Sequence, residues 1–368
     1  MPDFQLNIDC EGPLTQNDNA FELCEAFIPS GEDFFSKVSR YDDYLVEVEH
    51  RPDYKAGDTL KLILPFLKAF GLDSDSLQVF SAKTLMLLPG ADSFLRSLPD
   101  MLPSFIISTS YEPYLKALCD ITDFPSDCIY ATNVDLDRYT LDDDDRIRLQ
   151  IFLDHILGSK MIDWPDDARS VSDLSPDSRE SVDLMNRIFW QYIPSMSIGS
   201  ILDNVNPIGG TEKARAVEHS LKRTGLSLSQ VVYVGDSITD ANALELVVKS
   251  GGIGIAFNAN RYAIKKANWA LTGGDSRLIG AILSLILDKG PDALHNITSS
   301  QNWLAGKEFL DILRGQGVSS SFIDPLMSLS GLEIPTFSPV SLKNIDQLIE
   351  HGERVRKVVR GVATGALG

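Results

Sequence analysis

The chain of 368 residues is longer than one typical domain, which predicts a core domain with inserted or appended modules. Its hydrophobic content of 43% is sufficient for a buried core. A formal net charge of −19 excludes nucleic acid and anionic lipid as main partners, because so acidic a surface repels both. The same charge repels phosphorylated molecules, so a site for one needs a local cation.

Cysteine usage and hydropathy indicate a cytoplasmic protein. The four cysteines are scattered: Cys10, Cys24, Cys119 and Cys128. This spacing argues against a zinc site or a disulfide framework and predicts a reducing compartment. The N-terminal residues lack the basic and apolar regions of a signal peptide. The most apolar segment, 278–287, is too short for a membrane span and predicts a buried helix.

Apolar runs of strand length alternate with amphipathic segments of helix length along the chain. The first run, 4–8, is stopped by Gly12 and Pro13, which force a turn. The predicted strands are 4–8, 104–107, 128–131, 231–234, 252–257 and 269–271. This alternation predicts an α/β fold with one doubly wound parallel sheet that is covered by helices on both faces.

Two long segments interrupt the alternation and predict insertions into this core. The core itself is expected from residues 1–15, 87–133 and 208–290. Residues 16–86 carry helical patterning, and residues 134–207 form the second insertion.

Residues 291–368 are expected to form a C-terminal helical extension. Its final amphipathic helix, from about 342 to 362, could dock on a partner. More often such a helix packs on its own domain or forms a homodimer.

Polar side chains fall at the ends of the predicted strands. Asp9, Ser108 and Asp236 each lie within two residues of the C-terminal end of an apolar strand. In an open α/β sheet, ligands bind at this edge, near a topological switch point. We therefore expect these side chains to converge, although they are far apart in the sequence.

Two pairs of acids suggest catalysis and metal binding. Asp9 could attack phosphorus, and Glu11 could protonate the leaving oxygen and later deprotonate water. Asp236 and Asp240 open a helix four residues apart, which places them on one face, where they could hold Mg²⁺. Taken alone, the first pair is more typical of a solvated turn, and the second is equally typical of helix capping.

Ser108 and Lys213 are weaker candidates. The Ser108 hydroxyl and nearby backbone N–H groups could bind a phosphoryl oxygen, and Thr109 is a competing choice. Lys213 follows a glycine pair near a helix start, where its ammonium could keep a nucleophile ionised. A solvated surface lysine is the alternative interpretation.

In this order, the candidate residues resemble the motifs of the haloacid dehalogenase superfamily. The resembling motifs are Asp9-Cys10-Glu11-Gly12-Pro13, Ile107-Ser108, Lys213, and Gly235-Asp236-Ser237 with Asp240. The resemblance spans about residues 4–285, and the pattern is most similar to the phosphoserine phosphatase branch. The whole chain also resembles an archaeal branch labelled a subunit of an energy-converting hydrogenase, although no iron–sulfur or nickel ligand pattern is present.

The resemblance implies a Mg²⁺-dependent phosphatase that hydrolyses a small phosphorylated metabolite through an aspartyl phosphate. It implies a role for each matched residue: nucleophile for Asp9, acid/base for Glu11, phosphate binding for Ser108, charge stabilisation for Lys213, and metal ligation for Asp9, Asp236, Asp240 and the Glu11 main-chain carbonyl. It also implies that 16–86 is a helical cap over the site and that 134–207 is a second cap.

Glu11 departs from the family pattern, which has Asp at this position. Its carboxyl titrates in the same range but stands on one more methylene. Two alternatives therefore stay open. One is a catalytically weak or inactive protein of this fold that acts as a regulatory or assembly partner, for example of a hydrogenase. The other is a phosphotransferase.

Within the two insertions, several residues are candidates for substrate contact or packing. Candidate contacts in the first are Arg40, Tyr41, Tyr44, His50 and Arg51, for which packing is the plainer interpretation. Trp164 and Trp190 predict packing, and the acidic run 142–145 predicts a solvated loop.

Overall fold

The computed structural model describes residues 4–165, 167–299, 301, 303–361 and 365. Within them, eight strands form one sheet in the order β3-β2-β1-β4-β5-β6-β8-β7. The strands are β1 (Gln5–Ile8), β2 (Ser104–Tyr111), β3 (Ile129–Thr132), β4 (Val231–Gly235), β5 (Ile253–Phe257), β6 (Trp269–Thr272), β7 (Leu304–Ala305) and β8 (Thr336–Pro339).

The sheet is parallel from β3 to β6. The chain runs outward from β1 to β2 and β3, and then returns to β4 on the other side of β1. It continues from there through β5 to β6. The connections after β1 and β4 therefore leave in opposite directions, which makes the crevice between these two strands the topological switch point. The predicted doubly wound α/β fold is confirmed.

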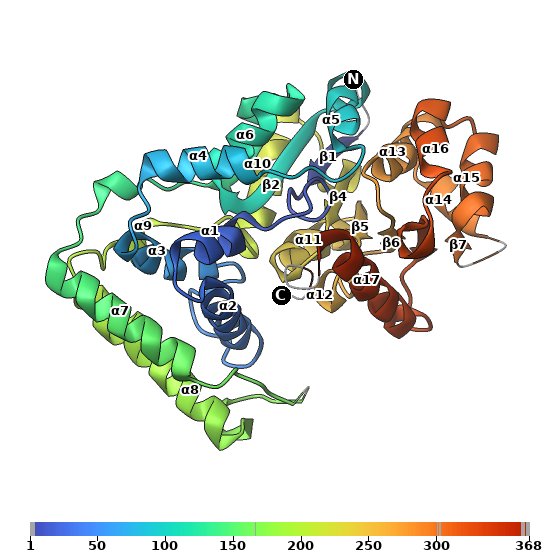
Figure 1. The fold of residues 1–368 in the computed structure, drawn as a ribbon. Helices are drawn as coiled ribbons and strands as arrows, with labels where there is room; N and C mark the ends of the chain where they lie inside the picture. Colours follow the sequence, from blue (N-terminus) through green and yellow to red (C-terminus); the bar gives the residue numbers. More distant parts are fainter. Residues whose placement is uncertain (1–3, 166, 300, 302, 362–364, 366–368) are drawn as a thin grey trace.

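Helices surround the sheet and form a separate body on one side of it (Figure 1). The α-helices are α1 (Asn19–Phe27), α2 (Gly31–Glu47), α3 (Thr59–Ala69), α4 (Ser74–Thr84), α5 (Ala91–Met101), α6 (Glu112–Thr122), α7 (Asp143–Gly158), α8 (Pro176–Arg187), α9 (Ile201–Asn204), α10 (Thr211–Thr224), α11 (Ala241–Lys249), α12 (Arg261–Ile264), α13 (Arg277–Lys289), α14 (Asp292–Thr298), α15 (Gly306–Gly315), α16 (Ser320–Leu326) and α17 (Ile345–Arg360).

Both faces of the sheet are covered. Helices α5, α6 and α13 pack on one face, against inward side chains that include Val232 and Val234. Helices α10, α11 and α17 pack on the other face, against Val231 and Tyr233. Because successive side chains of a strand point to opposite faces, a strand buried on both sides is apolar throughout. This explains why β4 has the clearest strand signal in the sequence.

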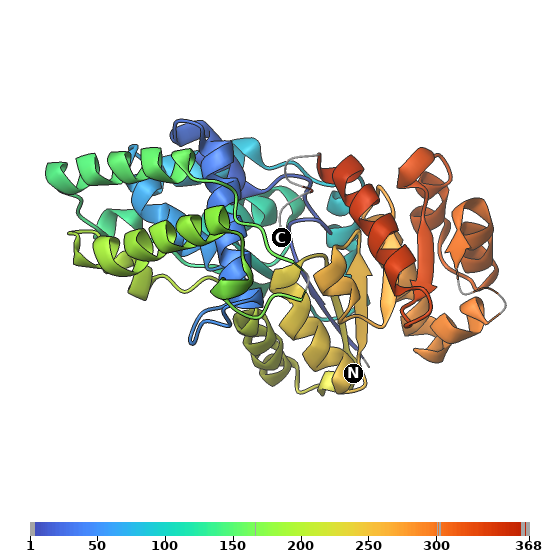
Figure 2. The same cartoon turned by 90° about the horizontal axis from the view of Figure 1, so that it is seen from below.

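Helices α1–α4 and α7–α9, here called the helical body, come from the two insertions and pack together beside the sheet (Figure 2). Their side chains share one hydrophobic core, in which Phe34 and Phe66 of the first insertion meet Phe189 of the second. Tyr111, at the end of β2, belongs to the same core and donates a hydrogen bond to the Leu60 carbonyl at 2.7 Å. The helical body is thereby attached directly to the strand end.

Two expectations from the sequence are wrong. The C-terminal segment is not purely helical, because β8 pairs antiparallel with β6 and β7 pairs with β8. These short strands cover an edge of the parallel sheet that would otherwise offer unpaired backbone groups. The acidic run 142–145 is not a solvated loop but the start of α7. Asp142 accepts the Asp145 N–H at 2.8 Å, as acids favourably do at helix N-termini.

Helix α13 is the buried helix expected at 278–287. Across the part of the chain that the structure describes, no helix combines the length and the hydropathy that crossing a membrane requires.

Candidate active site

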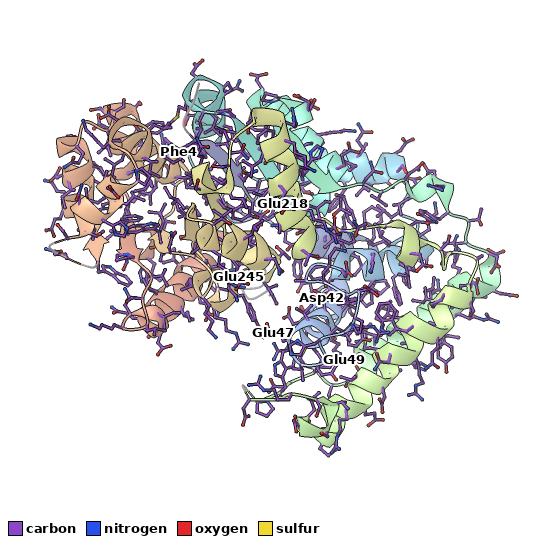
Figure 3. All side chains as sticks on the ribbon, turned by 180° about the vertical axis from the view of Figure 1, so that it is seen from behind. Phe4, Asp42, Glu47, Glu49, Glu218 and Glu245 are labelled. Carbon is purple, nitrogen blue, oxygen red and sulfur yellow. The ribbon has the colours of Figure 1, made fainter. Side chains whose placement is uncertain are left out.

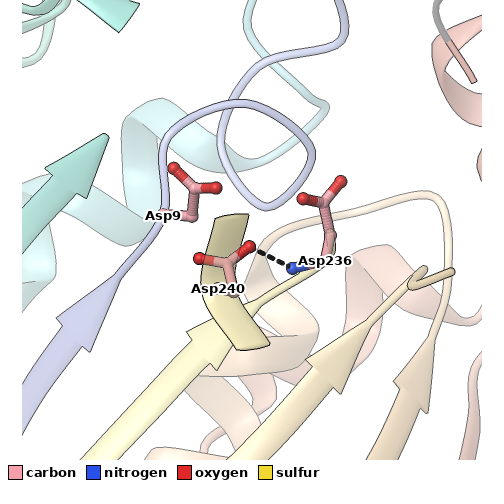
Figure 4. A group of neighbouring side chains, drawn as sticks. All are labelled: Asp9, Asp236 and Asp240. Atoms are coloured by element: carbon pink, nitrogen blue, oxygen red, sulfur yellow. Dashed lines mark hydrogen bonds between the residues drawn. The ribbon is translucent and has the colours of Figure 1, made fainter. Parts of the chain in front are cut away.

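Three carboxylates meet at the switch point between β1 and β4. Asp9 follows β1, Asp236 follows β4, and Asp240 closes the short 3₁₀ turn Ile238–Asp240 (Figure 4). One ligand oxygen from each lies within 4.8 Å of the others, and all three residues are buried. The structure thus brings together acids that are far apart in the sequence.

Lys213 joins this cluster from the first turn of α10. Its fully buried Nζ lies 2.6 Å from Asp9 Oδ2 and 2.8 Å from Asp240 Oδ1. Burial alone lowers an ammonium pKa, but Asp240 and Asp9 hold the pKa of Lys213 above its ordinary value. Lys213 is therefore a permanent cation inside the protein rather than a solvated surface residue.

Asp240 is satisfied by protein groups on both of its oxygens. Tyr233 donates its hydroxyl to Oδ1 at 2.8 Å, and the backbone N–H groups of Asp236 and Ser237 donate to Oδ2 at 3.0 and 3.1 Å. Although burial raises it, the Lys213 ammonium and these donors hold the pKa of Asp240 below its ordinary value. This arrangement favours a role for Asp240 in orienting Lys213 and the Asp236 loop over direct contact with a metal.

Asp9 lies on the wall of a cavity above the cluster. Its Oδ1 accepts the N–H of Cys10 at 2.7 Å, which fixes the orientation of the carboxylate. Burial and then Asp240 raise the pKa of Asp9, and the Lys213 ammonium opposes that rise. Lys213 therefore favours the ionised form that a nucleophile needs.

Glu11 connects the strand-end loop to the helical body. Its Oε1 accepts the N–H of Asn19, the first residue of α1, at 2.9 Å. Burial and then Asp18 raise the pKa of Glu11 to about 8, against the opposing effect of Arg360. This upward shift favours the protonated form, which is the form that a general acid requires.

The hydroxyls at the end of β2 differ in their access to the cavity. Thr109 and Ser110 line it, whereas the Ser108 Oγ accepts the Ser110 N–H at 3.1 Å beside it. Thr109 donates its own hydroxyl to the Ile208 carbonyl at 3.1 Å. The buried Ser110 hydroxyl lies next to Glu11, where it lowers the pKa of that carboxyl. Ser110, which the sequence reasoning missed, is thus a cavity-lining hydroxyl beside the candidate acid.

The cavity measures about 80 Å³ and lies between the sheet edge and the helical body. The sheet side contributes Asp9, Glu11, Thr109, Ser110, Asp236, Ser237, Ile238 and Thr239. The helical body contributes residues of α1, α2 and the start of α3, including Phe35, Ser39, Asp42, Asp43 and Thr59. Asp42 lies where α2 meets the sheet part of the molecule (Figure 3).

The candidate substrate contacts of the first insertion do not line this cavity: His50 is exposed, and the others pack in the helical body. The Arg40 guanidinium lies 3.6 Å from the Trp164 ring centre, and Arg51 lies 4.2 Å from that of Trp190. Tyr41 is buried and donates to Asn186 Oδ1 at 2.7 Å. A larger hollow of about 800 Å³, partly lined by Arg51 and Trp190, contains none of the converging acids. We therefore place the site at the smaller cavity.

Two arginines that the sequence reasoning missed complete the site. Arg356 and Arg360 of α17 line the cavity, and both guanidiniums form ion pairs with Asp236. The distance from Arg360 Nη1 to Asp236 Oδ2 is 3.2 Å. The available signal was their spacing of four residues along the buried face of an amphipathic helix, which includes Gly352 and Val355.

The residues present fit a small divalent cation such as Mg²⁺, which prefers carboxylate and carbonyl oxygens. Asp9 and Asp236 would hold it, with the Glu11 main-chain carbonyl. The backbone at Gly12 leaves room for the Asp236 carboxylate: Gly12 has φ +100°, and a Cβ there would lie 2.1 Å from Asp236 Oδ2. The two guanidiniums on Asp236 also show that this carboxylate attracts positive charge.

Comparison with known proteins gives structural relatives only. No family model matches the chain, and no curated protein is significantly similar in sequence. The structure of gene product AF1437 from Archaeoglobus fulgidus is 25% identical, with a TM-score of 0.75 over 99% of both chains. The fold is therefore shared over the whole length, including the C-terminal segment.

Haloacid dehalogenase hydrolases are also among the structural neighbours, at lower structural overlap. A substrate-bound phosphoserine phosphatase complex is 14% identical, with a TM-score of 0.45 over 76% of this chain and 97% of that one. A HAD family hydrolase from Salmonella enterica serovar Typhi is 14% identical, with a TM-score of 0.42 over 72% and 66%. Structural similarity with TM-scores this low carries no argument. The chemistry of the site is therefore inferred from the residues of this chain.

Proposed function

We propose that the chain is a phosphohydrolase that cleaves a small phosphate monoester through an aspartyl phosphate on Asp9, with Mg²⁺ as cofactor. The observation that carries the proposal is the buried Lys213 ammonium, held between Asp9 and Asp240 beside a cavity at the switch point. A buried cation against a carboxylate that faces a cavity favours a charged nucleophile and stabilises an anionic transition state.

The proposed reaction has two steps. Asp9 attacks phosphorus, and the bond between phosphorus and the ester oxygen breaks as the acyl phosphate forms. Glu11 gives its proton to the departing oxygen. In the second step Glu11 takes a proton from water, whose oxygen attacks phosphorus and releases inorganic phosphate and Asp9. When bound, Mg²⁺ supplies charge neutralisation for the phosphoryl oxygens.

The size of the cavity supports a small substrate. Its volume of about 80 Å³ is well below the roughly 300–1,000 Å³ of typical ligand sites. The Glu11 to Asn19 hydrogen bond also ties the helical body to the strand-end loop in this closed arrangement. We propose that larger substrates enter only when the helical body moves away from the sheet edge.

The test is hydrolysis of an aryl phosphate with and without Mg²⁺, comparing the wild type with Asp9→Asn. We expect Mg²⁺-dependent turnover that falls by at least about a thousandfold in the variant, because no covalent intermediate can form. Asp203→Asn, at an exposed position of α9, serves as the matched control and should keep wild-type turnover. Equal turnover by wild type and Asp9→Asn contradicts the mechanism.

One observation favours a second candidate, a protein of this fold that acts as a regulatory or assembly partner without turnover. Both arginines of α17 are bound to Asp236, the acid that an active site needs for its cation. This candidate predicts no hydrolysis across a broad phosphate-ester panel and no Mg²⁺ binding by calorimetry. A phosphotransferase would share the acyl phosphate and give transfer to an added alcohol in place of hydrolysis.

A further inference from the structure

We propose that Arg356 and Arg360 form the anion-binding part of this site and take the phosphate of the substrate once Asp236 is released to a divalent cation. The inference rests on the proposed function, which it deepens by naming the groups that bind the phosphate. It assigns a direct role in the site to the C-terminal helix α17, which lies outside the sequence motifs.

The two arginines are built into the interior of the protein. Their side chains are 2% and 4% exposed, respectively. They lie four residues apart on one face of α17, and both line the cavity with Asp9. The helix is placed close to the sheet by Gly352, where a Cβ would lie 2.5 Å from the Ala259 carbonyl oxygen. Long cationic side chains are rarely buried in this way without an anionic partner.

Each guanidinium is held near the loops that follow β1 and β4 by further contacts. Arg356 Nη1 donates to the Asp236 carbonyl at 3.2 Å in addition to the carboxylate. Arg360 Nε donates to the Gln16 carbonyl at 3.3 Å, and its Nη2 lies 4.0 Å from Asp18. Both groups are thus positioned before any ligand enters, which lowers the entropy cost of binding an anion.

Charge balance indicates what the arginines do when the site is loaded. Asp236 is contacted by both arginines, and Arg360 also lies near Asp18. A divalent cation on Asp9 and Asp236 would add two positive charges and compete with the arginines for Asp236. Beside this added charge, the two guanidiniums would favour an anion such as a phosphate ester in the cavity. Their planar donors also fit phosphate oxygens better than a lysine does.

The residues that α2 contributes to the cavity argue against a substrate orientation with the phosphate toward α2. There α2 presents the carboxyl groups of Asp42 and Asp43, which do not attract a phosphate. Asp42 is already held by the Tyr54 hydroxyl at 2.6 Å and the Gly57 N–H at 3.0 Å. The phosphate therefore belongs at the α17 end, and the uncharged or cationic part of the substrate at the α2 end.

The experiment measures two affinities by titration calorimetry in the full-length chain: that of Mg²⁺ alone, and that of inorganic phosphate at saturating Mg²⁺. Arg356→Gln and Arg360→Gln should each weaken phosphate binding by roughly 10- to 100-fold, because each removes a charge-assisted hydrogen bond. The same variants should bind Mg²⁺ more tightly, because a competitor for Asp236 is gone. Lys357→Gln, an equal charge change on the exposed face of α17, should alter neither affinity.

Weaker phosphate binding together with tighter Mg²⁺ binding separates a phosphate-binding role of the two arginines from a merely structural role. Arginine variants that lose both affinities together, or that keep wild-type phosphate affinity, overturn the inference. If the wild type turns over esters through Asp9 and the variants bind phosphate normally, only the inference fails. If the wild type binds Mg²⁺ and phosphate but turns over no ester, the proposed function fails. The arginine site is then supported if phosphate binding still falls in both variants and not in Lys357→Gln.

Discussion

Two regions of the molecule bring buried cations to the same acid cluster in different ways. On α10, one lysine serves two carboxylates, Asp9 and Asp240. On α17, two arginines contact the same carboxylate, Asp236, and Arg360 also lies 4.0 Å from Asp18. Lys213 cannot be removed without taking the shared cation from two acids. Asp236 is contacted by two cations, so one of these contacts can be exchanged for a contact with another anion. The first arrangement is suited to fixing a nucleophile and the second to exchanging ligands.

The strongest test of this contrast is Lys213→Met, which keeps the length of the side chain and removes its charge. Two buried carboxylates lose their shared partner, so we expect the free energy of unfolding to fall by about 3–5 kcal/mol. Chemical denaturation at neutral pH measures the change. Lys222→Met, at an exposed position of the same helix, should cost less than about 0.5 kcal/mol. A loss as small for Lys213 as for Lys222 would contradict the assigned pairing.

Arg356→Met, the equivalent change on α17, should lower the free energy of unfolding less than Lys213→Met does. Asp236 keeps Arg360 at 3.2 Å, so we expect a loss of about 1–3 kcal/mol. Denaturation of Arg354→Met, an exposed arginine of the same helix, gives the baseline. If Arg356→Met is as damaging as Lys213→Met, Arg360 does not compensate for the loss of Arg356 and the contrast between the two regions is wrong.

Asp43 of α2 extends the comparison to a buried acid for which burial outweighs the neighbouring cations. Burial and then Asp42 raise its pKa to about 8, with Glu47 adding to the rise and Arg40 and Arg261 opposing it. Because the folded pKa lies above the unfolded value of about 3.9, ionisation is penalised only in the folded state. Stability is therefore lost as the pH rises from about 4 through 8.

We expect Asp43→Asn to remove this part of the pH dependence. At pH 8 the variant should be more stable than the wild type by up to about 5 kcal/mol, and the difference should vanish near pH 4. Thermal unfolding across that range checks the sign. Asp154→Asn, at an exposed position of α7, should follow the wild-type curve. A variant that is less stable than the wild type at pH 8 would show that ionised Asp43 has a favourable partner.

The parts of the fold and site that could be predicted from the sequence have local signals. Strands buried on both faces form continuous apolar runs, so β1 and β4 were placed correctly. Parallel strands bring their C-terminal ends to one edge, so the convergence of Asp9 and Asp236 followed from strand positions alone. Lys213 lies on a helix that follows a glycine pair, and only its place in the series of motifs singled it out.

The missed parts depend on packing between distant segments. Strand β2 runs to Tyr111 instead of ending at 107, and its pairing with β3 shifts register between Ile107 and Tyr111. The cavity therefore meets Ser110 where the sequence suggested Ser108. Strand β8 is short and polar, so only its pairing with β6 defines it. Arg356 reaches Asp236 through the docking of a helix 120 residues further along the chain; the local pattern marks the buried face of that helix but not the acid that it meets.

The core shared within the helical body has a consequence for the modularity of the chain. Phe34 and Phe66 pack together, and Phe66 contacts Phe189, although the last belongs to a different insertion, with β2 and β3 encoded between them. Deleting either insertion alone would leave the apolar face of the other open to water, at a cost in solubility and folding yield. The two segments are thus one inheritable unit in two pieces of sequence, and a shortened homologue that still folds is expected to lack both or neither.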